Sequence, residues 1–315
     1  MVSTCTYELN SVPLDTDNCV VLVGSSLFSA VNTRRTVTQV GGRHGSIDLH
    51  TIPVFDEREM TLIVDAFEPK VYEESWRLMR LCMNPRLTIT RVMDGVRQVT
   101  RAELVSLTPD DDTSHPNRLV SFNAIFALPD VFWKSENAVV RMLSLTGGSI
   151  FPPTGPAITN GKGWWTRSLG EPDNSPSVLA NFVTMPTGEP DNSPSLLYTS
   201  IPEGYFGDAP ITGMVFRLPP KTTSFSATDP ISGTGVSWNG TSSEQYTYVD
   251  SGSLRAWRSS SESAWESGTN IIGVDYPTAG MLQVFPASDG SYALDMNTVG
   301  VEDGNVLARF YQHWW

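Results

Sequence analysis

Short apolar runs separated by turn residues recur along most of this chain, and they restrict its fold more than any other feature. Runs at residues 60–67, 86–92 and 97–105 are rich in aliphatic and β-branched side chains, and the last two flank Asp94-Gly95. An Asp-Gly pair between two such runs is a strong hairpin signal. The alternation returns after residue 205, at roughly the 8–12-residue spacing typical of sandwiches and barrels. The chain is therefore predicted to be mainly β.

One stretch departs from this alternation. Apolar residues between positions 71 and 83 recur at helical spacing, with two glutamates in the first turn and Asn84-Pro85 after the last. Acidic residues are favourable at a helix N-terminus, and the residue before a proline disfavours helix. One helix is predicted here, and its apolar face is predicted to comprise Tyr72, Trp76, Leu78, Met79, Cys82 and Met83.

The length of 315 residues exceeds that of one ordinary β domain and fits two. Composition changes at residues 146–204, where Gly, Pro, Ser, Thr and Asn dominate. The sequence is therefore divided into an N-terminal β-sandwich with one helix (1–145), a small β-rich insert (146–204) and a C-terminal sandwich of jelly-roll type (205–315).

The insert contains an internal repeat, because Gly-Glu-Pro-Asp-Asn-Ser-Pro-Ser occurs at residues 170–177 and again at 188–195. Two copies are too few for a solenoid, and the motif is turn chemistry, so two equivalent turns joining short strands are predicted. A flexible linker is the alternative. Adjacent side chains on a strand face opposite ways. One of Trp164 and Trp165 is therefore expected to be exposed as a sugar or partner contact, with simple packing as the competing interpretation.

Charge and hydropathy exclude several classes of function. The net charge is −13 and the arginines are scattered, which opposes sequence-specific nucleic-acid binding. An acidic wall is nevertheless compatible with a channel for DNA. No apolar run approaches the roughly 18 residues of a membrane span, and the N-terminus lacks a secretory pattern. The chain is expected to fold in a cytoplasm and remain soluble.

Catalytic and metal-binding motifs are not found. The three cysteines are widely spaced, the four histidines have no acid or thiol cluster beside them, and the acids at 110–112 do not match a calcium loop. Trp238, Trp257 and Trp265 are interpreted as core residues, with a sugar-stacking platform as the alternative. The chain is predicted to be an assembly or binding protein without catalytic, cofactor or metal sites, and a cell-wall hydrolase is the weakest alternative.

The first segment resembles the N-terminal module of distal tail proteins from long-tailed, siphovirus-type bacteriophages. The resemblance rests on the order of its features: a strand at 7–10, a glycine turn at 41–45, an Arg-bearing strand at 56–62, the helix, the hairpin and the closing aromatic run at 122–133. The last segment resembles the galectin-like second module of this family, in the versions found in phages of actinobacteria. Residues 146–204 have no counterpart in this pattern.

The resemblance implies a virion protein that is assembled in the host cytoplasm and forms a ring, usually a hexamer, at the tail tip around the DNA exit channel. Its implied partners are the tail tube protein, the tape measure protein and the baseplate hub protein. Some relatives carry sugar-binding inserts, so contact with host cell-wall carbohydrate is the alternative function.

Ring closure needs a surface repeated by rotation, and exposed strand edges are pairing templates. The strand at 7–10 is expected to add to a neighbour's sheet. Candidate interface residues are Gly41, Gly42, Arg43, Gly45 and Arg58, with intrachain ion pairs as the alternative for both arginines. The aromatic chain end at 310–315 is expected to close the second sandwich, with docking on a neighbouring protein as the alternative.

Overall fold

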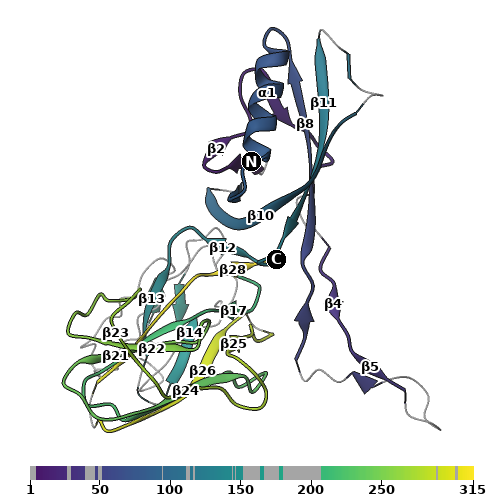
Figure 1. Cartoon of the computed structure of the whole chain (residues 1–315). Helices are drawn as coiled ribbons and strands as arrows, with labels where there is room; N and C mark the ends of the chain where they lie inside the picture. Colours follow the sequence, from purple (N-terminus) through teal and green to yellow (C-terminus); the bar gives the residue numbers. More distant parts are fainter. Residues whose placement is uncertain are drawn as a thin grey trace. The chain divides into compact units, whose positions relative to one another are not determined.

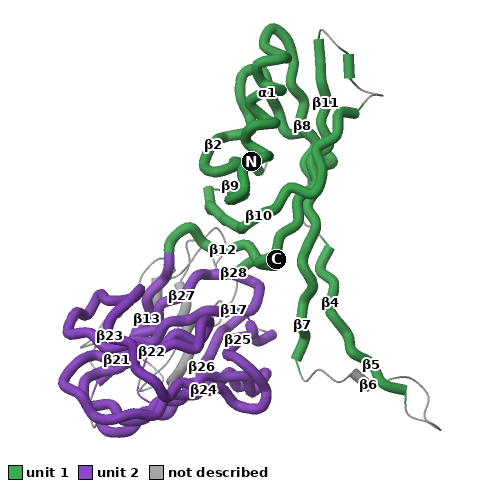
Figure 2. Tube along the Cα trace, viewed as in Figure 1, with its two compact units in different colours: residues 1–137, 313–315 green, residues 138–312 purple. Residues whose placement is uncertain are grey.

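The protein was analysed as a computed structural model. It describes residues 5–26, 30–39, 47–48, 52–93, 95–110, 114–115, 118–143, 145, 147–151, 164–166, 177–179, 207–288, 290–301 and 304–315. Figure 2 shows two compact units, Met1–Asn137 with His313–Trp315, and Ala138–Gln312. The first therefore ends before residue 145, and the last three residues belong to it. Within the described parts of the chain, no helix is long and apolar enough to span a membrane.

The first unit is built on one sheet with the strand order β2-β1-β9-β10-β11-β8-β3, with β12 beside β10 and β28 beside β12. Its strands are β1 (Cys5–Leu9), β2 (Val12–Pro13), β3 (Cys19–Val21), β8 (Arg58–Phe67), β9 (Leu87–Met93), β10 (Val96–Pro109), β11 (Leu119–Leu128), β12 (Trp133–Ser135) and β28 (His313–Trp314).

Strand β10 joins the two halves of this sheet. Its first half pairs with β9 and its second half with β11, and the register shifts at a bulge between Leu104 and Ser106. A bulge adds local twist, which lets one strand serve two differently oriented parts of a sheet. The predicted hairpin is confirmed: Met93 pairs with Val96, and Gly95 has a φ of +83°, which glycine adopts without strain.

The predicted helix is confirmed as α1 (Val71–Cys82), but part of the apolar face named from the sequence is exposed. Val71, Ser75, Leu78 and Cys82 are buried where α1 packs against the sheet. Tyr72, Trp76 and Met83 are exposed by 61%, 63% and 72%. At about 100° per residue these three lie on a flank beside the buried one, and the sheet covers only the narrower arc.

The second unit is a sandwich of two antiparallel sheets. The six-stranded sheet runs β13 (Val139–Leu143), β27 (Val306–Phe310), β18 (Val215–Leu218), β21 (Tyr246–Asp250), β22 (Arg255–Ser259) and β23 (Thr269–Ile271). The five-stranded sheet runs β14 (Gly147–Phe151), β26 (Tyr292–Val299), β19 (Ser224–Thr228), β20 (Gly235–Asn239) and β24 (Val274–Asp275). A short pair, β17 (Ile211–Thr212) with β25 (Gln283–Val284), adds to these. The mainly β class is thus confirmed.

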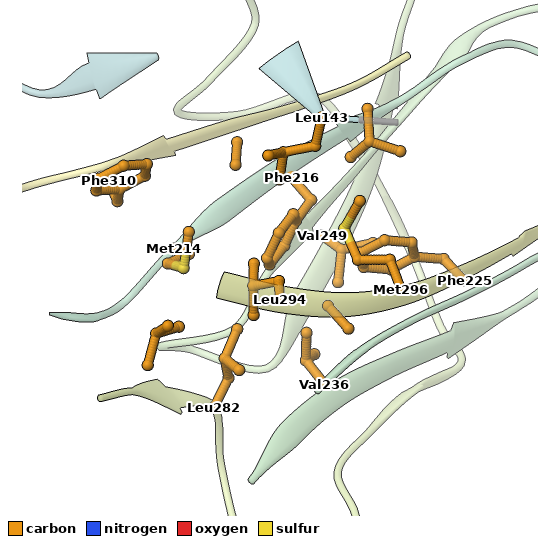
Figure 3. Close-up of a cluster of buried hydrophobic side chains, with 14 of the residues drawn as sticks. Leu143, Met214, Phe216, Phe225, Val236, Val249, Leu282, Leu294, Met296 and Phe310 are labelled. Carbon is orange, nitrogen blue, oxygen red and sulfur yellow. The ribbon is translucent and has the colours of Figure 1, made fainter. Parts of the chain in front are cut away.

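Apolar side chains from both sheets fill the space between them. Phe216 and Val249 come from one sheet and Phe225, Val236 and Leu294 from the other, and all are buried in one cluster (Figure 3). Two tryptophans expected in the core are buried. Trp238 belongs to this cluster and donates to the carbonyl of Ile272, and Trp257 stacks on Tyr248.

The aromatic chain end divides between the units. Phe310 belongs to the core of the second unit, as expected, whereas Trp314 lies in the core of the first. Strand β28 pairs with β12 through Trp133↔Trp314 and Lys134↔His313. The expectation that the whole segment closes the second sandwich was therefore wrong beyond Gln312. Residues 313 and 314 pair instead with β12 in the sheet of the first unit.

The three thiols predict a labelling pattern. Burial raises the pKa of Cys19 to about 11 and that of Cys82 to about 12, while Cys5 is half-buried. Because the thiolate is the reactive form, a thiol reagent at pH 8 should modify Cys5 first and the other two only on unfolding. Counting modified thiols against time measures this, and Cys5→Ser should remove the early phase. More than one rapidly modified thiol in the native protein would contradict the burial described here.

Candidate assembly surface

A two-stranded arm extends from the first unit (Figure 1). It comprises β4 (Thr33–Arg34), β5 (Val37–Thr38), β6 (Ile47–Asp48) and β7 (Val54–Phe55). The strands β4 and β7 pair through Thr33↔Phe55, and β5 and β6 pair through Thr38↔Ile47. Residues 30–39 are all exposed.

At its base, the arm contacts the rest of the first unit. The ring of Phe55 packs edge-on against Phe132 and Trp315, with centroids 5.8 and 4.9 Å apart. The amide of Asp56 donates to the carbonyl of Asn32 at 2.9 Å, and its carboxylate pairs with Arg34 at 2.8 Å. That ion pair is exposed and contributes little. Because an isolated two-stranded ribbon is marginally stable in water, the outer arm is expected to need a surface to lie on.

The outer strands β3 and β2 of the main sheet are capped by the chain itself. At β3, the amide of Thr16 donates to the carbonyl of Cys19 at 2.7 Å, and the amide of Val21 donates to the carboxylate of Asp15 at 2.8 Å. At β2, Pro13 has no N–H, and its carbonyl accepts a bond from Arg77. The predicted strand at residues 7–10 corresponds to β1, which pairs along its whole length with β9 and at Glu8 and Leu9 with β2. Its pairing with the sheet of a neighbouring copy stays a prediction.

The candidate interface residues have different outcomes. Gly41, Gly42, Arg43 and Gly45 lie between β5 and β6 in the sequence and outside the described residues, so their interface role stays a prediction. Arg58 is 1% exposed, and its guanidinium donates to the carbonyl of Val131 at 3.1 Å. It is held inside the unit, which corrects its expected role as a surface anchor.

The chain end is bound by a buried arginine. Arg91 donates to Gln98 at 2.5 Å and to the backbone oxygen of Trp315 at 2.7 Å, and its guanidinium lies 4.4 Å from the ring centroid of Trp133. His313 stacks on Phe132 with centroids 5.6 Å apart. A buried guanidinium requires such partners, since an unpaired buried charge costs several kcal/mol. These contacts fix β28 in the first sheet, close to the base of the arm.

An ion-pair network links β1, β10 and the segment after β12. Arg97 donates to both carboxylate oxygens of Glu8 at 2.8 Å and to Glu136 at 2.9 Å. The bidentate contact lowers the pKa of Glu8, and the same hydrogen bonds raise the pKa of Arg97.

The remaining candidates concern chemistry. Among the described residues, no group of three or more His, Cys, Asp or Glu side chains is placed to hold a metal ion. Trp164 and Trp165 belong to β15 (Trp164–Thr166), which pairs with β16 (Ser177–Leu179). Their side chains lie outside what the structure describes, so the predicted sugar contact stays a prediction. The two copies of the repeat lie almost wholly outside the described residues.

Sequence reasoning missed the arm and the return of the chain end. Residues 33–39 read Thr-Arg-Arg-Thr-Val-Thr-Gln, which combines β-branched residues with no apolar face. That combination indicates a strand exposed on both sides, because its residues favour the extended backbone but provide no apolar face that could pack in a core. The two-residue strand β28 carries no comparable signal.

Comparisons with known proteins were made with this geometry in view. The sequence matches no protein-family model and no curated protein. The fold is similar to the crystal structure of the Dit protein of phage SPP1, reported as a paradigm of the hub adsorption apparatus in phages infecting Gram-positive bacteria. The TM-score is 0.56 at 11% identity, covering 99% of this chain and 100% of that chain. At this identity, the likeness shows the fold alone.

Two chains of the phage p2 baseplate, in activated conformations with Ca and with Sr, also align. Identities are 11% and 10%, coverage is 98–99% of this chain and 98% of those chains, and the TM-score is 0.38 in both cases. A score this low does not establish a common fold.

The network around Arg97 predicts a pH dependence. A carboxylate whose pKa is lower in the folded state stabilises that state above its unfolded pKa, and this contribution is lost as the pH falls through the folded pKa. Glu8→Gln should therefore cost about 1 kcal/mol at pH 7, and the cost should shrink below the ordinary glutamate value of 4.5. Hydrogen–deuterium exchange of β1 and β9 in a urea series would measure it. Glu103→Gln, an exposed site on β10, is the control, and a pH-independent difference would contradict the prediction.

Proposed function

We propose that this chain is a structural protein of a phage tail tip, a distal tail protein that assembles into a ring around the DNA exit channel. The observation that carries the proposal is the exposed arm, on a unit in which the outer strands β2 and β3 are capped. The fold likeness to the SPP1 Dit protein over the full length of both chains supports it, as does the resemblance in sequence order.

The physical argument concerns where copies can join. Heterologous interfaces that close by rotation make rings, and such an interface needs a donor element and an acceptor surface on each copy. Because the outer sides of β2 and β3 already carry intrachain hydrogen bonds, extension of the main sheet at these two strands is disfavoured. Among the described parts of the first unit, the arm is the element that projects from the sheet with its residues 30–39 exposed. We therefore propose that the arm is the donor element of the contact between copies.

The finer assignments belong to the same proposal. The ring is a hexamer, its partners are the tail tube, tape measure and baseplate hub proteins, and the protein is a virion component assembled in the host cytoplasm. The first unit makes the ring and the second is a galectin-like module. The net charge of −13 fits a channel wall that does not retain DNA. We propose no enzymatic activity, and release of fragments from purified peptidoglycan would contradict this.

Shortening the arm tests the proposal. Replacing residues 36–52 by Asn-Gly leaves a two-residue hairpin loop between positions 35 and 53, a length that favours closure. Light scattering should show a ring-sized species for the natural chain and a folded monomer for the variant. Removal of residues 170–177, one copy of the repeat, is the control and should leave the ring intact. A natural chain that stays monomeric at high concentration and does not bind a tail tube protein would refute the assignment.

The alternative, binding of host cell-wall carbohydrate, rests on the adjacent tryptophans of β15. Aromatic faces are common sugar platforms, since they combine apolar area with a polar edge. Trp164→Ala and Trp165→Ala are each expected to be folded, and at least one should bind isolated cell wall several-fold more weakly. Tyr311→Ala, which removes an exposed ring elsewhere, is the control. Unchanged sedimentation of both variants with cell wall would remove the insert from consideration.

A further inference from the structure

Helix α1 carries an apolar stripe that its own unit does not cover. The stripe consists of Tyr72, Trp76 and Met83, with half-buried Met79 between the last two. The spacing of four, three and four residues places all four on one flank of the helix. The buried flank faces β8, β10 and β11, and Arg77 on the other side is bonded to the carbonyls of Pro13 and Leu14. Exposed Trp, Tyr and Met are enriched at protein interfaces.

We propose that the α1 stripe receives the arm of a second copy of this chain. This rests on the proposed function, because it names the acceptor surface of the ring contact for which the arm is the donor. Each copy would give one arm and receive one, which is the requirement for closure by rotation. In Figure 1 the arm leaves the first unit at the end away from α1, so the two surfaces are separate on one copy.

The dimensions of the two surfaces agree. From Tyr72 to Met83 the stripe is roughly 16 Å long at the helical rise. The paired part of the arm from Thr33 to Thr38 is roughly 17 Å long at the strand rise. The exposed part of the stripe supplies on the order of 300–400 Å² of apolar area. That is about half of one partner's side of a standard interface, and it suits the apolar centre of a larger contact.

The chemistry of the two surfaces is complementary. The arm presents Val31 and Val37, exposed by 37% and 49%, for contact with the rings of the stripe. Residues 30–39 include two arginines and no acid. A guanidinium stacks favourably on an exposed tryptophan face, and Trp is the best such partner. Arg34 forms an exposed ion pair with Asp56, so exchanging that partner for Glu73, which is exposed beside the stripe and 3.6 Å from Lys70, would cost little.

Photo-crosslinking tests the contact directly. The full chain with p-benzoyl-phenylalanine at position 76, mixed with isotope-labelled natural chain, should give crosslinks between copies to peptides from residues 30–57. Crosslinks to the second unit, to α1 of another copy or within one chain would overturn the inference. Light scattering on the same sample separates the two claims. A ring-sized species crosslinked elsewhere refutes the acceptor surface alone, whereas a strict monomer refutes the proposed ring itself.

A substitution gives a second readout. Trp76→Ser removes the largest ring of the stripe from an exposed position, so the fold should persist while assembly weakens at least about tenfold. Tyr276→Ser, at an exposed position of the second unit, is the matched control and should assemble normally. A Trp76→Ser protein that assembles at the concentration of the natural chain would overturn the inference.

Discussion

The return of the chain end to the first unit is the constraint on which the rest of the structure depends. Arg91 binds the backbone oxygen of Trp315 and lies over Trp133, so β28 is held beside β12 by a buried charge that must keep its partners. The second unit is therefore an insertion between two paired strands of the first. Both of its chain connections are fixed at one place in that sheet, and Trp315 at this place also packs against Phe55 at the base of the arm.

In the proposed ring, this arrangement makes the arm the element through which copies join. A sheet with open edges could associate through either end, and a ring would then compete with irregular polymers. Here Asp15, Thr16 and Pro13 cap the outer sides of β3 and β2, which disfavours those competing modes at these two strands. In the proposed ring, the contact between copies is assigned to the arm, which projects from the unit. The capped strands argue for a specific rather than a general association.

Local sequence signals predicted the hairpin at Asp94-Gly95 and the helix at 71–83, because turn chemistry and helical spacing act within a few residues. The buried flank of α1 was not predictable from the same spacing. Apolar residues cover a wider arc than the sheet does, and only tertiary packing decides that Leu78 is inside and Trp76 outside. Arg58 was predicted to be an interface anchor because a guanidinium makes planar, multi-donor contacts, yet the carbonyl of Val131 offers it a buried partner. For residues 40–46, the sequence pattern remains the basis of the assignment.

The composition of the arm fits an element that is exposed before it is bound. An apolar ribbon with two open edges would aggregate, whereas threonine retains β propensity and arginine keeps the surface soluble. The run Thr33-Arg34-Arg35-Thr36 therefore allows the arm to persist on a free copy. Among the described residues of the arm, Val31 and Val37 are exposed apolar positions. In the proposed contact, the helix flank that exposes Tyr72 and Trp76 supplies further apolar area, and neither partner has to refold.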